Sequence, residues 1–256
     1  IKCDDICNTN LYANNPYSAR HEVEMLAKAI EKCGREIVLS LSPGPALIAQ
    51  AWHYETFANM WRITDDFWDD WRLLKDMFHR CELWQSHVSK GCYPDCDMLP
   101  LGSLGKGFGR ERLTNFTEQE QRTMMTLWCL FGSPLMIGAE LTKLDAHTLE
   151  LLTNREILAM LPPECKPRQL ALDEDKAIWT AANSDSGEVY VALFNLRDEA
   201  SEVALDLRKA DIAVHAPWKE LWTGEERSAG KSIITEKLPT KGCAVFRSRI
   251  QFVPSR

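Results

Sequence analysis

Two features are scarce in this 256-residue sequence: long apolar runs and clusters of positive charge. No apolar run reaches the roughly 18 positions that a membrane-spanning helix requires, so the sequence predicts no membrane partner. Thirty basic side chains stand against thirty-seven acidic ones, which gives a net charge of −7. Because no basic run is present either, binding to a phosphate backbone has no electrostatic basis, and nucleic acid is not an expected partner.

Cysteine is present, but not in a pattern that determines a structure. The nine cysteines are scattered too widely for a small disulfide scaffold, and their odd number leaves at least one outside any pairing within the chain. The histidines and cysteines between His79 and Cys96 are the best metal candidates. However, Cys92 and Cys96 have no second cysteine pair at the spacing of a zinc site. We therefore predict no metal site and no cofactor.

The stretch 61–71 (WRITDDFWDDW) combines four carboxylates and one guanidinium with three tryptophans. Acidic side chains usually lie in water, whereas indole rings are buried or contact a flat apolar ligand. The mixture therefore predicts a pocket with an aromatic floor and acidic walls. A sugar ring suits such a pocket because it has apolar C–H faces and many hydroxyls, and cleavage of its glycosidic bond requires two carboxyl groups.

Helices and short apolar strands alternate over the first 160 residues, with polar residues gathered where a strand gives way to a helix. This is the pattern of a (β/α) barrel. The helices follow from apolar residues at helical spacing and, at Thr117, from a capping-box motif. Helices are predicted over 19–33, from 67 onward, over 117–131 and over 145–160, and strands over 1–5, 36–41, 60–64, 98–101 and 134–138.

A closed barrel needs eight strand–helix units and typically about 250 residues, whereas this stretch supplies four units and the tip of a strand. We therefore predict an α/β fold in which residues 1–160 form the C-terminal half of a (β/α)8 TIM barrel, from the tip of strand 4 to helix 8. The N-terminal half of the barrel is missing and is an expected partner. Residues 161–256 are predicted to form a small antiparallel β-sandwich, with strands over 177–182, 189–196, 203–207, 218–222, 232–238 and 242–247.

Four short motifs occur in the order and at the spacing of one known family. They are Lys2-Cys3-Asp4, Trp61-Arg62-Ile63-Thr64-Asp65-Asp66, Asp95-Cys96-Asp97-Met98-Leu99 and the strand from Ser133 to Gly138. Together they resemble the glycoside hydrolase family 27 enzymes, the α-galactosidase and α-N-acetylgalactosaminidase group. The segments 221–224 and 242–244 are similar to that family's terminal β-domain. The resemblance implies a retaining exo-glycosidase that hydrolyses terminal α-galactosides by double displacement.

The resemblance also assigns the two carboxyl groups. Asp4 would be the nucleophile and Asp66 the acid/base, both at the ends of barrel strands on the catalytic face. A retaining enzyme holds such carboxyl groups roughly 5–5.5 Å apart. A cation at Lys2 would lower the pKa of Asp4, while burial of Asp66 beside Trp61 or Trp68 would favour its protonated form.

The remaining site residues are expected to bind the sugar. By resemblance, Lys2 hydrogen-bonds hydroxyls, and Arg62 holds the 2-hydroxyl with support from Asp97. Trp61 would contact the substrate as part of the aromatic enclosure. Ser42 occupies the position at which the α-galactosidases carry a Glu and the N-acetylgalactosaminidases a Ser, although the loop that follows, 43–46, is unlike that of either group.

Substrate and class stay open between related alternatives. A small side chain at Ser42 leaves room for an α-N-acetylgalactosaminide, or for a β-L-arabinopyranoside, which shares the hydroxyl pattern of galactose. A non-catalytic galactose-binding protein or an inactive fragment is the alternative from another class. The expected partner is an oligosaccharide or glycoconjugate, and relatives in the family imply a secreted, periplasmic or lysosomal location.

Several residues near these motifs are predicted to be structural. Asp65, Asp69 and Asp70 suit the N-terminus of a helix, where negative charge is favourable. Trp68, Trp71 and Phe78 are expected in the core. The segment 115–117 matches the N-glycosylation pattern, but its Thr already serves as the predicted helix cap.

Overall fold

A computed structural model describes residues 1–7, 14–15, 17–106, 109–212, 216–229 and 232–249. The helices are α1 Arg20–Lys32, α2 Ala51–Phe57, α3 Trp71–Trp84, α4 Glu118–Phe131, α5 Ala146–Thr153 and α6 Arg155–Leu158, with 3-10 helices at Ile48–Gln50, Gln85–His87, Leu141–Lys143 and Leu207–Ala210. The strands are β1 Lys2–Asp4, β2 Ser40–Ser42, β3 Met60–Arg62, β4 Tyr93–Asp95, β5 Met98–Leu99, β6 Ser103–Leu104, β7 Arg112–Leu113, β8 Met136–Ile137, β9 Cys165–Leu172, β10 Lys176–Asn183, β11 Glu188–Asn195, β12 Ser201–Asp206, β13 Trp218–Glu220, β14 Glu226–Arg227, β15 Ile233–Leu238 and β16 Cys243–Arg249.

The N-terminal region is built on an arc of parallel strands. β1, β2, β3 and β4 are hydrogen-bonded in that order, and the register places Asp4 opposite Ser42 and Arg62 opposite Asp95. β4 leads into β5 through a kink at Asp97, whose φ is 71°, and β5 then pairs in parallel with β8. Among the described residues, neither β1 nor β8 has a strand on its second edge. The arc is therefore open on both sides.

The structure corrects the predicted strands in two ways. The run predicted at 36–41 is a strand only over Ser40–Ser42, and the run at 98–101 is a strand only over Met98–Leu99, preceded by the separate strand β4. Short strands β4, β6, β7 and β14 and the long strand β9 were not predicted. β4 and β9 each contain a proline, Pro94 and Pro167, which weakens the sequence signal of a strand.

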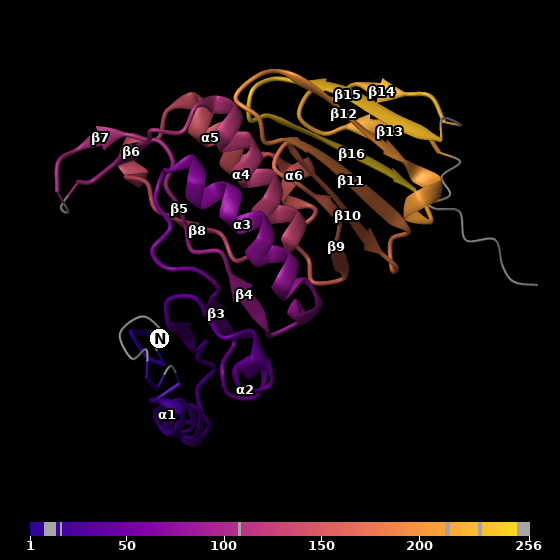
Figure 1. Cartoon of the computed structure of the whole chain (residues 1–256). Helices are drawn as coiled ribbons and strands as arrows, with labels where there is room; N and C mark the ends of the chain where they lie inside the picture. Colours follow the sequence, from indigo (N-terminus) through magenta and orange to yellow (C-terminus); the bar gives the residue numbers. More distant parts are fainter. Residues whose placement is uncertain (8–13, 16, 107–108, 213–215, 230–231, 250–256) are drawn as a thin grey trace, which may run out of the picture.

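Helices α3 and α4 lie between the parallel arc and the C-terminal β-region (Figure 1). The N-cap of α3 is Asp70, whose side chain accepts a hydrogen bond from the backbone N–H of Arg72. α4 starts with the predicted capping box, in which Thr117 and Glu120 bond each other's backbone N–H groups. It ends at Gly132, whose φ of 83° suits a residue without a side chain.

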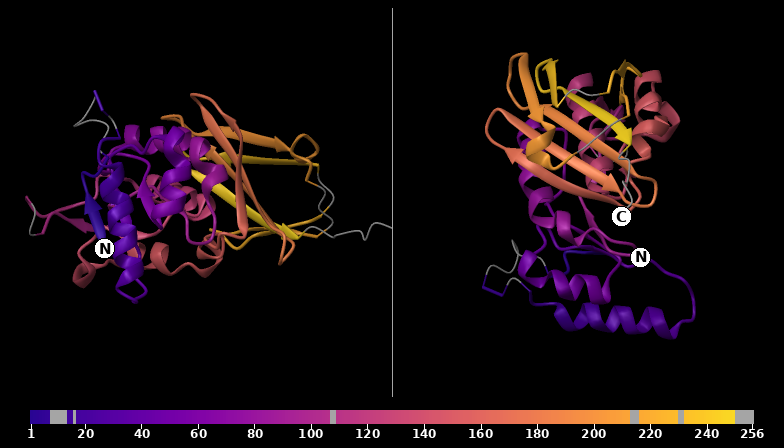
Figure 2. Two further views of the ribbon diagram at one scale, coloured as in Figure 1. Left: turned by 90° about the horizontal axis from the view of Figure 1, so that it is seen from below. Right: turned by 90° about the vertical axis from the view of Figure 1, so that its right-hand side faces the viewer.

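The C-terminal region consists of two antiparallel sheets packed face to face, with α1 at the far end of the other region (Figure 2). The larger sheet has the order β14-β13-β16-β11-β10-β9, and β12 pairs with β15. Val191, Leu193 and Phe246 from the larger sheet are buried against Val203 from the smaller one. Each such burial contributes roughly 1.5–3 kcal/mol.

The other face of the larger sheet packs on α3 and α4. Phe78 of α3 and Phe194 of β11 meet edge to face, with ring centroids 4.9 Å apart. Both belong to one hydrophobic cluster that also includes Trp128 of α4 and Trp179 of β10. A shared apolar core therefore joins the two regions.

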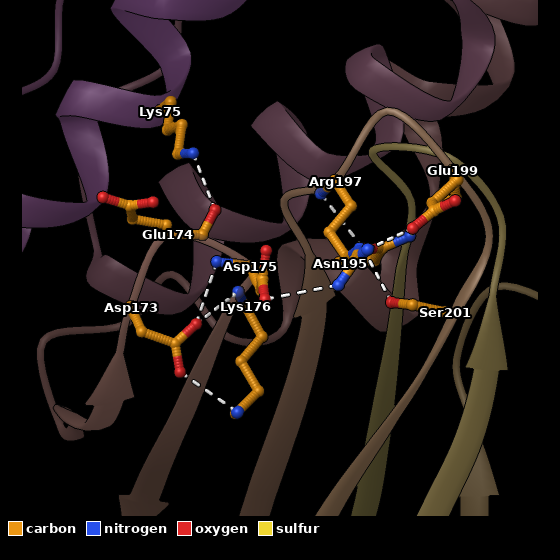
Figure 3. Close-up of polar contacts among 9 residues, drawn as sticks. All are labelled: Lys75, Asp173, Glu174, Asp175, Lys176, Asn195, Arg197, Glu199 and Ser201. Carbon is orange, nitrogen blue, oxygen red and sulfur yellow. Dashed lines mark hydrogen bonds and ion pairs between the residues drawn. The ribbon is translucent and has the colours of Figure 1, made fainter.

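At the margin of this contact lies a polar depression of about 460 Å³, called here the junction hollow (Figure 3). Lys75 Nζ donates to the carbonyl oxygen of Glu174 at 2.7 Å. Arg197 pairs with Asp175 at 3.3 Å and with Glu199. Its residues are Lys75, Glu174, Asp175, Leu196, Arg197, Asp198 and Glu199.

Candidate active site

A second polar depression lies at the carboxyl ends of the parallel strands. Asp4, Ser42 and Arg62 are the last residues of β1, β2 and β3. Because neighbouring parallel strands end at the same edge of a sheet, these side chains come together, and the loop after β3 adds Asp66. The depression holds about 370 Å³ and is called here the strand-end cleft; its residues are Asp4, Asp5, Ser42, Gly44, Arg62, Asp65 and Asp66.

Asp4 stands beside a cation, as predicted. Lys2 Nζ lies 3.1 Å from Asp4 Oδ1. The hydrogen bond from Lys2 lowers the pKa of Asp4; partial burial opposes this, and a hydrogen bond with Ser42 reinforces it. Ser42 is itself buried, and its hydroxyl is hydrogen-bonded to the carboxylate. Asp4 is therefore held in its ionised form, with 71% of its side chain exposed to the cleft and solvent.

Arg62 joins two carboxylates that come from different loops. Its side chain is only 12% exposed, and its Nη1 and Nη2 lie 2.5 Å from Asp66 Oδ1 and 2.6 Å from Asp97 Oδ1. The predicted contact between Arg62 and Asp97 is thus present. A guanidinium fork that is fixed by a buried carboxylate can hold its second partner in a defined direction.

Asp95 and Asp97 form a buried pair behind Arg62. Burial raises the pKa of Asp97, against the opposing effects of the Phe67 N–H and of Arg62. Burial likewise raises the pKa of Asp95 to about 6, although its Oδ1 accepts the Asp97 N–H at 2.8 Å. Sequence reasoning gave no role to Asp95, and the two-residue spacing from Asp97 was the signal that could have linked them.

The prediction that Trp61 contributes to an aromatic enclosure of the site is wrong. Trp61 alternates with Arg62 along β3, so its ring points to the opposite face of the strand. It is fully buried and stacks on Tyr54, with ring centroids 5.5 Å apart, so it does not reach a substrate in the cleft. Asp66 is not enclosed either, because 72% of its side chain is exposed.

The acidic residues after Asp66 divide between two roles. Asp70 caps α3, as expected of a residue at a helix N-terminus. Asp69 was predicted to have the same role, and this is corrected: its side chain is 2% exposed and pairs with Arg112. Phe78 is buried and Trp71 packs against the same core, as predicted.

The cysteines are all present as thiols. Cys81 and Cys96, which lay among the metal candidates, are buried with their sulfur atoms 3.6 Å apart. In the described part of the chain, no group of three or more His, Cys, Asp or Glu is arranged to hold a metal ion. Nor does any helix there have the length and apolar character of a membrane span.

Two family matches cover most of the chain. Residues 3–161 match the family described as Alpha galactosidase A, and residues 173–248 match the one described as Alpha galactosidase C-terminal beta sandwich domain. Alpha-galactosidase 2 of Arabidopsis thaliana is 25% identical over 240 residues, which are 91% of this chain and 57% of that protein. The alpha-galactosidase of Cyamopsis tetragonoloba is 24% identical and covers 90% of this chain and 54% of its own.

Solved structures agree with these matches. A GH27 β-L-arabinopyranosidase from Geobacillus stearothermophilus superposes with a TM-score of 0.90 at 40% identity, over 100% of this chain and 58% of that one. Alpha-galactosidase I from Mortierella vinacea shares the fold, with a TM-score of 0.79 at 18% identity over 96% of this chain and 66% of its own. The predicted fold class, half of a TIM barrel followed by a β-sandwich, is confirmed.

The chain spans a little over half the length of these two curated relatives. The family match, by contrast, covers well over half of the chain, and the resemblance inferred from the four motifs is confirmed by it. This chain belongs to the family described as Alpha galactosidase A.

Proposed function

We propose that the protein is a retaining exo-glycosidase that removes terminal α-D-galactosyl residues. The observation that carries this proposal is that Asp4 and Asp66 line one cleft, each hydrogen-bonded to a different cation. Retaining hydrolysis needs one ionised carboxylate and one carboxyl group that carries a proton. Asp4 is bonded to Lys2 and Ser42, whereas Asp66 is bonded to Arg62, whose other nitrogen is held by Asp97.

In the first step, the Asp4 carboxylate forms a bond to the anomeric carbon while the bond to the leaving oxygen breaks. Lys2 and Ser42 keep Asp4 ionised and fix its direction. Asp66 gives its proton to the leaving oxygen. A bound sugar covers Asp66 from water and competes for Arg62 through a hydroxyl, and both changes favour the protonated carboxyl.

In the second step, water attacks the same carbon and Asp4 departs. Asp66, now ionised, takes the proton of that water. The two carboxylates are bound by different nitrogens of Arg62. Nη1 can therefore exchange its hydrogen bond to Asp66 for one to a substrate hydroxyl while Nη2 stays bonded to Asp97. Arg62, Lys2 and Asp97 are thus the proposed binding residues, and Trp61 is not among them.

A second candidate substrate is a β-L-arabinopyranoside. Identity to the Geobacillus stearothermophilus β-L-arabinopyranosidase is 40%, against 24–25% for the α-galactosidases compared above. The two sugars share their ring hydroxyl pattern, and arabinopyranose lacks the exocyclic CH₂OH. An α-N-acetylgalactosaminide is the third alternative, since Ser42 is small.

The rest of the site would come from the other half of the barrel. Apolar side chains beside the open edges are exposed, with Ile1 62% exposed next to β1 and Met136 and Ile137 52% and 43% exposed on β8. Strands that pair with β1 and β8 would cover them and complete the barrel. The proposed division of this chain is a barrel domain over 1–160 and a sandwich domain over 161–256.

The test is made on the full-length protein. It is offered the 4-nitrophenyl α-D-galactoside, the β-L-arabinopyranoside and the α-N-acetylgalactosaminide, and the anomer first released is identified by NMR. Retention of configuration is expected, with the preferred sugar decided by kcat/KM. An inverted product would contradict double displacement, and binding by calorimetry without turnover would identify a galactose-binding protein instead.

A further inference from the structure

The loop between β3 and α3, residues 63–70, carries the proposed acid/base, and the part that follows Asp66 is attached to the protein at Phe67 and at Asp69. The Phe67 N–H donates to Asp97 Oδ2 at 2.8 Å, and the Phe67 ring is buried against Trp128, with ring centroids 4.9 Å apart. The second attachment is Asp69. Asp66 lies between Arg62 on one side and this doubly attached segment on the other.

Asp69 accepts three hydrogen bonds, which is more than a carboxylate that only caps a helix N-terminus would accept. Arg112 Nη1 and Nη2 donate to its two oxygens at 2.5 and 2.7 Å, and the Asn115 N–H donates at 2.5 Å. Its side chain is 2% exposed. A buried carboxylate satisfied by a bidentate guanidinium and a backbone N–H is a rigid anchor.

The other half of this anchor is itself fixed. Arg112 belongs to β7, which pairs with β6 in a hairpin that projects beyond the strand arc (Figure 1). The hairpin is held to the segment after β8, because the Glu140 N–H donates to the Ser103 carbonyl oxygen at 2.9 Å and Lys106 pairs with Glu140 at 3.0 Å. The pair between Asp69 and Arg112 thus ties the loop of Asp66 to the loops that follow β5 and β8.

Asp66 needs such support because it has little of its own. Its side chain is 72% exposed, and among the described residues its contact with the protein is the hydrogen bond from Arg62. Substrate is expected to compete for that bond. The backbone of the loop then determines where the carboxyl group stands, and a displacement of about 1 Å is enough to impair catalysis by a large factor.

We propose that Asp69 is a positioning residue that, through its pair with Arg112, places Asp66 for proton transfer to the leaving oxygen. The inference rests on the proposed function of Asp66 as acid/base. It assigns to Asp69 an effect on the two proton transfers of Asp66, to the leaving oxygen and then from the attacking water, and kcat/KM reports the first of them. Attack by Asp4 and binding of the sugar by Lys2 are left to other elements.

Leaving groups of different basicity separate these events. A 2,4-dinitrophenyl glycoside departs without protonation, whereas a phenyl glycoside needs the acid. For Asp69→Asn in the full-length protein, we expect kcat/KM to fall about tenfold to a hundredfold on the phenyl glycoside and by less than about threefold on the dinitrophenyl one, since proton transfer contributes about 10²–10⁴-fold. Arg112→Gln, made on the 39% exposed partner, should give the same selective loss.

The control is Asp70→Asn, which changes the neighbouring carboxyl group at the cap of α3. Because Asn caps a helix about as well as Asp, this variant should leave the ratio between the two substrates unchanged. Equal losses on both substrates for Asp69→Asn and Arg112→Gln, or no loss on either, would overturn the inference. If the wild-type protein hydrolyses neither glycoside, the proposed function itself is wrong. That result differs from equal losses in the variants and from no loss in them.

Discussion

The junction hollow and the strand-end cleft are both polar depressions lined by acids and arginine, yet their charges are compensated in different ways. In the junction hollow, Arg197 and its partner Asp175 are 41% and 61% exposed. In the strand-end cleft, Arg62 is 12% exposed, and its partner Asp97, which lies behind it, is 5% exposed. Exposed pairs are screened by water and contribute little, whereas a buried pair loses much when one partner is removed.

The comparison shows that size and polarity do not by themselves identify a reactive site. The junction hollow is the larger of the two, at about 460 Å³ against 370 Å³. The cleft places two exposed carboxylates side by side with different partners: Asp4 pairs with the half-exposed Lys2, and Asp66 pairs with the largely buried Arg62. Such an arrangement can distinguish two carboxyl groups chemically, which is what acid/base and nucleophilic roles require.

The largest expected difference between the two depressions concerns activity. Asp4→Asn should lower kcat by about 10⁴-fold or more, because removal of a covalent nucleophile abolishes the main reaction path. The matched change in the other depression, Asp175→Asn, should leave kcat within about twofold, since surface substitutions away from a site are nearly neutral. Steady-state hydrolysis of the preferred aryl glycoside measures both, and similar losses would remove the distinction between the depressions.

The next effect concerns stability. Arg62→Ala leaves Asp97 buried beside Asp95 without its cation, and should lower the free energy of unfolding by about 3–5 kcal/mol at pH 7.5. Arg62→Lys retains the charge but cannot serve both carboxylates, so it should be destabilised less. Urea unfolding of the full-length protein measures the series. If Arg62→Ala lowered the free energy of unfolding by less than about 1 kcal/mol, the Arg62–Asp97 pair would contribute no more than an exposed ion pair.

The pH dependence of Asp95 gives a third test. Its pKa is raised from the ordinary 3.8 to about 6 in the folded protein. The folded protein therefore keeps a proton that the unfolded chain has released. The resulting stability is fully present below about pH 4 and is lost as pH rises through 6, amounting to about 3 kcal/mol for a shift of roughly two pH units.

Asp95→Asn should remove that dependence while its side-chain oxygen still accepts the Asp97 N–H. Relative to wild type, its free energy of unfolding should rise by about 3 kcal/mol between pH 4 and pH 8. Asp175→Asn, made on an exposed carboxylate of the junction hollow, is the control and should track wild type across this range. A constant difference between Asp95→Asn and wild type at both pH values would contradict the burial argument.

The smallest effect is expected in the junction hollow. Arg197→Ala breaks ion pairs with Asp175 and Glu199, all with side chains more than 40% exposed. Its free energy of unfolding should change by less than about 1 kcal/mol, and half a molar of salt should reduce the difference further. A loss as large as that of Arg62→Ala would mean that exposure does not separate the two depressions.

Much of this molecule follows from residues whose local pattern is strong. The capping box of Thr117 and Glu120 is encoded within four residues, and α4 starts there. Asp4, Arg62 and Asp66 come together because parallel strands bring their carboxyl ends to one edge, a consequence of topology that a sequence can predict. The short motifs therefore indicate which side chains meet in the strand-end cleft.

The features that the sequence did not predict depend on the direction in which a side chain points and on partners that are distant in the sequence. Successive side chains of β3 point to opposite faces, so only one of Trp61 and Arg62 can face the cleft. A strand of three residues is too short for its alternation of polar and apolar residues to show which one. The partner of Asp69 lies 43 positions away in a hairpin that was not predicted. Local sequence favoured a helix-terminal role for Asp69, and tertiary pairing determined the outcome.

The most direct test of the central claim, that Asp4 and Asp66 act from opposite sides of one sugar, is azide rescue of Asp4→Gly and Asp66→Gly. In Asp4→Gly, azide should replace the carboxylate and yield a glycosyl azide of inverted configuration. In Asp66→Gly, azide should intercept the glycosyl-enzyme and yield the azide of retained configuration. The same anomer from both variants, or no glycosyl azide from Asp4→Gly, would contradict the account.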